Sequence, residues 1–282
     1  MIPYEALLKV RSPDREFAWS DRDAMLYALG IGMGGDPLDA DELAFVYEKD
    51  LKVVPSFATV AAWGSNPPLA ATGVDYSRVV HAEQAIRLHR PLPASARVKA
   101  DGGIIAAIDK GDKGAILMAE TMLRDAETGE PYVTLSVGWF ARADGHFGGP
   151  ATGGAAPHIV PDRPPDKSVD YVTRADQALL YRLAGDRNPL HADPEAARRA
   201  GFERPILHGL CTFGICCRAV LQHYAAFEPE RMVSHKLRFS APVYPGDVVT
   251  VDLWRDGDLV SFQARVKARN ATVIQNGCAE VR

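Results

Sequence analysis

The sequence predicts an α+β fold in which two similar domains are fused, each an antiparallel sheet wrapped around a central helix. One observation is a helical pattern that recurs at the same phase 154 positions later, between Ala24 and Ala178. Another is that each half continues into three alternating segments separated by turn residues, which is typical of antiparallel strands. A repeat this long suits two fused domains rather than a solenoid. The matching positions are Ala24, Leu26, Tyr27 and Leu29 in the first half and Ala178, Leu180, Tyr181 and Leu183 in the second.

A short motif marks the first helix. Ser20 is followed three residues later by Asp23, which resembles a capping box with Asp in place of the usual Glu. The helix is expected to carry residues 24–29 and to stop at Gly30. Strands are expected at residues 97–108, 115–124 and 132–141, with turns at residues 109–111 and 128–129.

A segment rich in glycine and proline, residues 145–165, separates the two halves. This composition is typical of a linker that lies on the surface. We therefore divide the chain into an N-terminal domain at residues 1–145, a linker at residues 146–165 and a C-terminal domain at residues 166–282.

The second half shows the clearest helix and hairpin signals. Residues 178–183 indicate a helix that should end near Gly185. Residues 210–224 are apolar nearly all round, which predicts a buried helix. Alternating strands are expected at residues 249–254 and 262–268, joined through Asp256 and Gly257, with a third strand at residues 272–281.

The composition excludes several functional classes. The chain has 282 residues, 47% of them hydrophobic, which is enough for a large core. Its net charge is −4 with both signs interspersed, so there is no basic surface for nucleic acid or anionic lipid. No apolar stretch approaches a membrane span, and the first residues do not resemble a signal peptide.

The expected compartment is the cytoplasm. The four cysteines, Cys211, Cys216, Cys217 and Cys278, show neither metal-ligand spacing nor a small-domain disulfide pattern, so reduced thiols are expected. The last residues, 279–282, do not form a peroxisomal address of the Ser-Lys-Leu type.

Asp186 and His191 are the candidate catalytic pair. They are five positions apart and would lie on different faces of a helix. Pro189 and the expected helix end at Gly185 indicate a turn instead, which lets both side chains reach one water molecule. A carboxylate and an imidazole can then perform general acid–base chemistry without a metal. The alternative is that Asp186 only stabilises a turn or caps a helix and that His191 only binds backbone.

The surrounding strings resemble the R-specific 2-enoyl-CoA hydratases of the MaoC-like group (hydratase 2 type). This group includes the hydratase portion of the peroxisomal multifunctional enzyme of β-oxidation. The resemblance rests on residues 185–191 and 205–211, with weaker matches at residues 27–32, 47–48, 88–93 and 109–111. It implies a double hot-dog fold, the name given to a sheet curled around one apolar helix. Two such units in one chain can form the pair that single-domain relatives build as a homodimer.

The resemblance implies a hydro-lyase of fatty acid metabolism. The expected reaction is reversible hydration of trans-2-enoyl-CoA to (3R)-3-hydroxyacyl-CoA. Asp186 and His191 would hold the water, and the backbone N–H of Gly209 would stabilise the enolate oxygen. The alternative is that Gly209 is only a turn or close-packing glycine. No metal or redox cofactor is implied, acyl-CoA is the expected partner, and a homodimer is expected from the family.

The resemblance also implies a set of substrate-binding residues. Lys110 would bind a CoA phosphate, with a solvated turn lysine as the alternative. Ala82 stands where relatives commonly have glycine and would narrow that part of the pocket. Asn188 would fix the turn, and the role of Glu48 is open. The complete set is Asn188, His81, Ala82, Lys110, Phe239 and Glu48.

The N-terminal half lacks a copy of the catalytic pair. At the same offset Asp186 falls on Gly32 and His191 on Pro37, and neither residue titrates. We expect this half to accommodate the acyl chain. The alternatives are a dehydratase acting on 3-hydroxyacyl-carrier-protein or on a branched or dicarboxylic acyl-CoA, a thioesterase, and a non-catalytic acyl-CoA-binding module.

Overall fold

In the described part of the chain, ten strands form one antiparallel sheet in the order β1-β3-β4-β5-β2-β7-β10-β9-β8-β6. The computed structural model describes residues 2–12, 15–154 and 156–282. The strands are β1 (Arg15–Trp19), β2 (Val79–Leu88), β3 (Ala96–Asp109), β4 (Ala115–Asp125), β5 (Pro131–Ala141), β6 (Lys167–Val172), β7 (Met232–Phe239), β8 (Val248–Asp256), β9 (Leu259–Val266) and β10 (Ala271–Val281).

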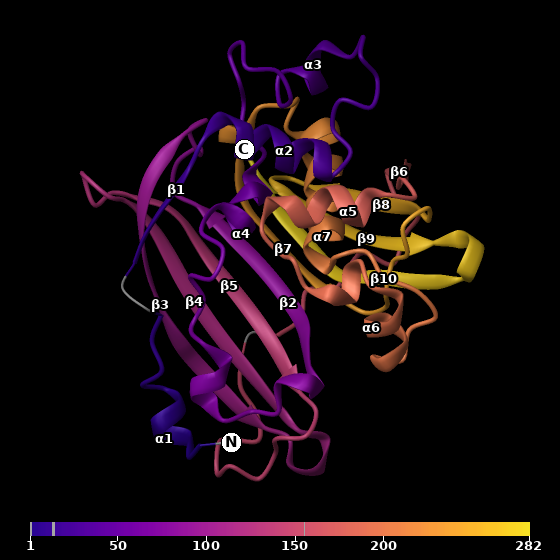
Figure 1. Cartoon of the computed structure of the whole chain (residues 1–282). Helices are drawn as coiled ribbons and strands as arrows, with labels where there is room; N and C mark the ends of the chain where they lie inside the picture. Colours follow the sequence, from indigo (N-terminus) through magenta and orange to yellow (C-terminus); the bar gives the residue numbers. More distant parts are fainter. Residues whose placement is uncertain (1, 13–14, 155) are drawn as a thin grey trace.

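The two halves meet where β2 pairs with β7 in the middle of the sheet. Glu83 lies opposite Arg238, and Ile86 lies opposite His235. Figure 1 shows strands of the first half on one side of this junction and strands of the second half on the other. The predicted antiparallel architecture with two related halves is confirmed.

Seven α-helices accompany the sheet in the described parts of the chain. They are α1 (Tyr4–Leu7), α2 (Asp21–Gly30), α3 (Ala40–Leu43), α4 (Ala58–Ala61), α5 (Gln177–Tyr181), α6 (Pro194–Arg199) and α7 (Gly209–Tyr224). None of them combines the length and apolar character that a membrane crossing requires.

The longest helix, α7, is the predicted central helix of the second half. It packs against β7, β8 and β9 (Figure 1). Phe213, Cys217 and Val220 are completely buried, as expected for a helix that is apolar nearly all round. Each large apolar side chain buried in this way contributes about 1.5–3 kcal/mol.

In the described residues of the first half, no central helix as long as α7 covers the sheet. Its counterpart is a 3-10 turn at Pro55–Phe57 followed by the four residues of α4. Ala62 leaves helical geometry, with φ −126° and ψ 60°. This half also contains a second apolar cluster, which includes Leu7 of α1 and Trp139 of β5.

The recurring helical pattern marks two helices that pack together. Tyr27 of α2 and Tyr181 of α5 are both fully buried, and their ring centroids lie 5.8 Å apart. At the start of α2 the backbone N–H of Ser20 donates to the Asp23 carboxylate at 2.9 Å, which confirms the capping box. Similar helices in the two halves therefore form one joint contact at the centre of the molecule.

Several strand boundaries differ from the prediction. The β8–β9 hairpin turns at Gly257, with φ +63°, but β9 begins at Leu259 and ends at Val266 because Lys267–Arg269 form a 3-10 turn. The sequence patterns also missed β1, β2, β6 and β7. The described residues of 146–165 contain neither helix nor strand, and the segment contacts the second half where Asn276 donates to the carbonyl of His158 at 2.6 Å.

A buried histidine under α7 should make the fold sensitive to acid. His235 is fully buried, with its ring 4.6 Å from that of Phe213 and 4.8 Å from that of Phe262. Burial lowers its pKa to about 3, and the nearby backbone of Phe213 opposes this shift. Below about pH 6.5 the unfolded chain therefore binds a proton that the folded chain does not. The free energy of unfolding decreases as the pH is lowered.

We expect His235→Leu to weaken this acid sensitivity by up to about 1.4 kcal/mol per pH unit below pH 6.5. Urea unfolding of the wild type and the variant at pH 7 and pH 5 measures it. The exposed His89→Leu controls for the loss of a histidine as such. Equal losses of stability between the two pH values in the wild type and His235→Leu would contradict the prediction.

Candidate active site

A short turn after α5 positions the candidate catalytic pair. The chain continues from α5 into a 3-10 turn at Arg182–Ala184 and then leaves helical geometry at Gly185, with φ +157°. The predicted helix end at Gly185 is confirmed. A β-carbon on Gly185 would lie 3.2 Å from the Trp63 indole, so a side chain of the first half borders this turn.

Asp186 and Asn188 stabilise the turn through their own backbone. One carboxylate oxygen of Asp186, Oδ1, accepts from the N–H of Asn188 at 3.0 Å. The side-chain oxygen of Asn188 in turn accepts from the N–H of Leu190 at 3.0 Å. These bonds are Asx turns, so Asn188 has the turn-forming contact that was expected of it. The other oxygen of Asp186, Oδ2, faces His191.

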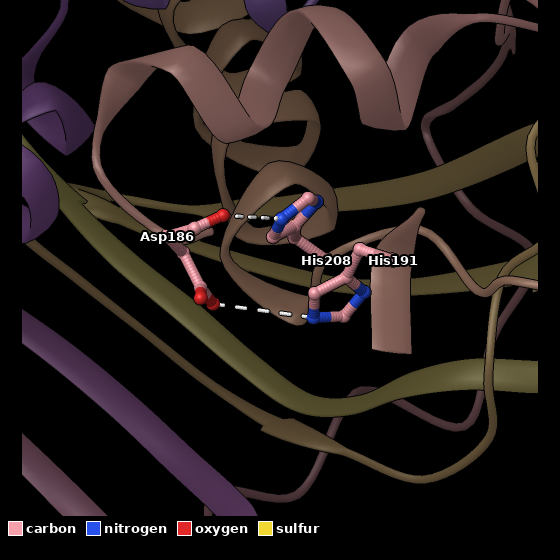
Figure 2. Close-up of side chains that lie close together, drawn as sticks. All are labelled: Asp186, His191 and His208. Atoms are coloured by element: carbon pink, nitrogen blue, oxygen red, sulfur yellow. Dashed lines mark hydrogen bonds and ion pairs between the residues drawn. The ribbon is translucent and has the colours of Figure 1, made fainter. Parts of the chain in front are cut away.

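The hydrogen bonds of His191 fix which ring nitrogen is basic. Its Nδ1 lies 2.8 Å from the carbonyl oxygen of Ile206, and a carbonyl only accepts, so Nδ1 carries the proton. In the neutral ring Nε2 then has the free lone pair. Nε2 lies 3.9 Å from Oδ2 of Asp186 (Figure 2).

That distance is too long for a direct hydrogen bond and leaves both atoms available to one water molecule. Asp186 and His191 both bond to backbone, as a purely structural role would require. Oδ2 of Asp186 and Nε2 of His191 nevertheless stay free to react. His191 is buried, and burial lowers its pKa below the ordinary value, although the Ile206 carbonyl and the Asp186 charge oppose the shift. The imidazole is therefore neutral and able to accept a proton at neutral pH.

His208 completes the cluster and was not assigned a role from the sequence. Its Nε2 lies 3.0 Å from the backbone carbonyl oxygen of Asp186 and donates to it. Its ring stacks on that of His191 with the centroids 3.7 Å apart. Figure 2 shows the two rings beside Asp186. Burial, and next the neighbouring His191, lower the pKa of His208 to about 3. The signal that could have identified it is its position directly before Gly209.

Gly209 begins α7 with an available backbone donor. The amides of Cys211 and Thr212 bond to the carbonyl of His208, whereas no hydrogen bond from the Gly209 amide is found within the described residues. The first amides of a helix have no partner in the helix and carry a favourable dipole for an anion. A β-carbon on Gly209 would lie 3.3 Å from the Phe239 ring, so a side chain here would crowd Phe239.

Three of the predicted substrate-binding residues gather at the β2–β7 junction. The rings of His81 on β2 and Phe239 at the end of β7 lie 5.0 Å apart. Ala82 is the extra residue of a β-bulge, because the register with β5 shifts between His81 and Glu83. The Nε2 of His81 donates to the carbonyl of Glu83, and desolvation lowers the pKa of His81 to about 4. Phe239 connects this group to Gly209.

Lys110 follows β3 at the same end of the sheet as His81 and Phe239, but it lies several strands away from them. The pairings of β3 with β4, β4 with β5 and β5 with β2 align Asp109, the last residue of β3, with Val79, the first residue of β2. Three strand spacings separate them, or roughly 14 Å. The ammonium group of Lys110 donates to the carbonyl of Ala151 at 3.0 Å.

The structure does not bring Glu48 to this cluster. It is an exposed residue in the segment that follows α3. In the same segment Phe45 packs against Phe227, which lies just beyond the C-terminal end of α7. Gly209 lies at the opposite end of that helix, and sixteen residues span about 24 Å.

Asp186, His191 and His208 also form a group of potential metal ligands whose donor atoms lie within 4.8 Å of one another. The bonds to the carbonyls of Ile206 and Asp186 leave one nitrogen on each ring, Nε2 of His191 and Nδ1 of His208. The two rings are stacked at 27°, so lone pairs in their planes converge poorly on one ion. The donor set suits hydrogen bonding to a water molecule better than it suits a shared cation.

In the first half, a buried ion pair lies at the place that corresponds to the Asp186 turn of the second half. Glu42 is only 3% exposed and forms an ion pair with Arg218 of α7. Its other carboxylate oxygen accepts from the backbone N–H of Gly34 at 2.9 Å. Gly32, the counterpart of Asp186, lies against the same guanidinium, since a β-carbon there would be 3.2 Å from it. This half therefore holds a structural ion pair where the other half holds the cluster.

Comparison with known proteins accounts for both halves. The MFE-2 hydratase 2 N-terminal domain matches residues 17–143, and the MaoC like domain matches residues 158–276. The enoyl-CoA hydratase ChsH3 of Mycobacterium tuberculosis is 36% identical over 98% of this chain and 97% of its own. The peroxisomal enoyl-CoA hydratase 2 of Arabidopsis thaliana is 38% identical over 96% of this chain and 93% of its own.

A solved structure agrees. The MaoC-like dehydratase from Phytophthora capsici superimposes with a TM-score of 0.88 at 30% identity, covering 99% of this chain and 98% of that one. The two hydratases and the solved dehydratase each match this chain over nearly its whole length and over nearly the whole of their own. The chain therefore belongs to the MaoC-like hydratase 2 family.

Proposed function

We propose that the protein is an (R)-specific enoyl-CoA hydratase, a hydro-lyase that reversibly converts trans-2-enoyl-CoA to (3R)-3-hydroxyacyl-CoA. The observation that carries the proposal is the 3.9 Å gap between Nε2 of His191 and Oδ2 of Asp186. Two relatives are named enoyl-CoA hydratases. A third, from Mycobacterium tuberculosis and 38% identical over 85% of this chain, is named a 3-hydroxyacyl-thioester dehydratase, which is the same reaction in reverse.

Water activation follows from the tautomer of His191. A water molecule between Nε2 and Oδ2 donates one proton toward each and directs an oxygen lone pair at C3 of the substrate. As the C3–O bond forms, the imidazole removes the proton from that water. Asp186 orients the water and lies close enough to favour the imidazolium that results.

The electrons displaced from the double bond move to the thioester oxygen. The amide of Gly209 donates to that oxygen, with the N-terminus of α7 adding a favourable dipole. The dyad then returns a proton to C2 as the enolate collapses. The balance is one water consumed, with hydroxyl on C3 and hydrogen on C2. No metal or redox cofactor takes part in this proposal.

We assign the CoA nucleotide to the sheet end that carries Lys110. The thioester lies at Gly209 beside His81 and Phe239, and the nucleotide is separated from it by the extended pantetheine arm. A separation of roughly 14 Å between the ends of β3 and β2 suits that arrangement. The ammonium of Lys110 can exchange its bond to the Ala151 carbonyl for a charge-assisted bond to phosphate.

We assign the acyl chain to the N-terminal half, residues 1–145. Trp63 of this half borders the Asp186 turn, and His81 of the same half contacts Phe239. Here α4 has four residues, against sixteen in α7, so a shorter helix covers the sheet. Long or bulky chains are the expected substrates.

The remaining functions differ in what they do to the thioester. A dehydratase for a carrier-protein-bound or a branched or dicarboxylic acyl group would use the same dyad with different pocket walls. A thioesterase would release free CoA, whereas a binding module would hold acyl-CoA without turnover. Nε2 of His191 and Oδ2 of Asp186, which are both free to hold water, favour hydration or dehydration over binding alone.

Incubation with trans-2-enoyl-CoA esters of increasing chain length tests the proposal. We expect loss of the conjugated double bond and a (3R)-hydroxyacyl product, with turnover extending to long chains. Product stereochemistry is read by chiral chromatography, and free thiol is measured in parallel. Release of CoA would identify a thioesterase, and turnover limited to four-carbon substrates would refute the assignment of the acyl chain to the N-terminal half.

Asp186→Asn and His191→Gln should each lower kcat by about 10²- to 10⁴-fold, because each removes one partner of the catalytic water. Asp186→Asn should not disturb folding, since the new amide keeps an oxygen that accepts from the Asn188 N–H. His191→Gln should not either, since its amide keeps an N–H that can donate to the Ile206 carbonyl. Asp193→Asn, which keeps the cap of α6, is the matched control in the same loop. Steady-state rates near the wild-type value in either dyad variant would refute the mechanism.

Two further properties are proposed, namely a homodimer, which rests on the family resemblance, and a cytoplasmic location. The free, buried thiols of Cys211, Cys216 and Cys217 suit a reducing compartment. Light scattering should give twice the chain mass of 30.6 kDa. A mass of one chain at micromolar concentration would contradict the dimer, and recovery in an organelle fraction would contradict the location.

A further inference from the structure

The segment of residues 206–209 contains or contacts every proposed catalytic group. The carbonyl of Ile206 accepts from His191, and His208 bonds to the backbone of Asp186 and stacks on the ring of His191. Gly209, the proposed donor to the enolate oxygen, follows His208 directly. His208 is 1% exposed and is the residue that precedes the first turn of α7. Its position links the dyad to the helix end.

We propose that His208 is the positioning residue that holds Asp186, His191 and Gly209 in one arrangement. It does so through a hydrogen bond to the Asp186 carbonyl, a ring stack beneath His191, and its own place at the start of α7. The inference rests on the proposed hydratase function and concerns the same site. His208 itself does not touch the reacting atoms.

The hydrogen bond fixes the turn that carries the carboxylate. Gly185 has a backbone conformation, φ +157° and ψ −53°, that residues other than glycine rarely adopt. The Asx turns of Asp186 and Asn188 tie these side chains only to residues that follow them directly in the chain. The bond from His208 to the Asp186 carbonyl ties the turn to a helix 22 positions away. Without it, the carboxylate can move relative to the water that it must orient.

The stack fixes the plane of the base. His191 is held at one edge by the Ile206 carbonyl, which still allows the ring to rotate about that bond. The face of His208, 3.7 Å away, removes this freedom and keeps Nε2 directed at Oδ2 of Asp186. Because Ile206 and His208 are in the same segment, both restraints on the base move together with Gly209.

His208 must be a neutral donor to do this. The groups around it are the ring of Tyr181 at 4.9 Å, the ring of His191, the carbonyl of Asp186 and the more distant charge of Arg182. Burial is the main reason that its pKa falls to about 3. A proton on His208 would place a cation beneath His191 and weaken it as a base.

Two substitutions separate the contributions of the stack and the hydrogen bond. His208→Phe keeps a flat ring beneath His191 but cannot donate to the Asp186 carbonyl, whereas His208→Gln keeps a donor without the ring. The matched controls are His223→Phe and His223→Gln, at the other end of α7. For each protein we measure kcat, KM and the pH profile of kcat/KM on an enoyl-CoA ester, and the folded fraction by circular dichroism.

We expect His208→Phe to lower kcat by about 10²-fold with KM within about threefold, because a displaced catalytic group costs rate rather than affinity. His208→Gln should keep kcat within about tenfold of the wild type, because its amide can still donate to the Asp186 carbonyl. It should also shift the acid limb of kcat/KM to higher pH, because water reaches His191 once the ring is gone. Both His223 variants should match the wild type.

Folded His208 variants with wild-type kcat and an unmoved acid limb would overturn the inference. Nitrogen NMR of the histidine rings in the wild type tests it without any substitution at the site, through the expected Nε2–H form of His208 that stays neutral above pH 5. A ring protonated at pH 6, or protonated on Nδ1 alone, would also overturn it. Loss of the proposed function would instead show as a wild type inactive on every ester.

Discussion

The pairing of β2 with β7 is the interaction on which the site depends. Among the described strands it is the place where the two halves bond to each other, within a sheet that otherwise consists of two consecutive sets of strands. It brings His81 of the first half to Phe239 of the second, and Phe239 covers Gly209 at the start of α7. The buried contact between Tyr27 and Tyr181 holds the helices of the two halves in the same relation. The proposed thioester position therefore exists only in the joined molecule.

Fusion of two halves in one chain allows them to specialise. The ion pair between Glu42 and Arg218 occupies the first half beside the counterpart of the catalytic turn. A buried ion pair adds little net stability because desolvation offsets the attraction, but breaking it leaves an uncompensated charge. The pair joins α7 of one half to the segment around α3 of the other. It thus specifies how the halves fit together, while the second half keeps the groups suited to chemistry.

The sequence patterns predicted the elements whose partners are close along the chain. The β3–β4–β5 and β8–β9–β10 ladders follow from alternation and turn residues, and the Gly185 turn follows from glycine, asparagine and proline chemistry. The β2–β7 pair could not be found in this way, because its partners are far apart in sequence and no turn connects them. The short α4 was also missed, since a few matching residues give the phase of a helix and not its length. The bond from His191 to the Ile206 carbonyl involves backbone, which leaves no side-chain signature.

Burial of imidazole links catalysis to stability in this fold. A base removed from water loses affinity for protons, so His191 is neutral where the reaction needs it, and the nearby Asp186 limits that loss. The same desolvation lowers the pKa of His81 to about 4 and that of His208 to about 3. In the unfolded chain each ring binds a proton below about pH 6.5, so the stability that these sites contribute is complete above that pH and falls as the solution becomes more acid. The acid limits of activity and of folding therefore share one physical cause, the exclusion of water that the dyad and its supporting ring require.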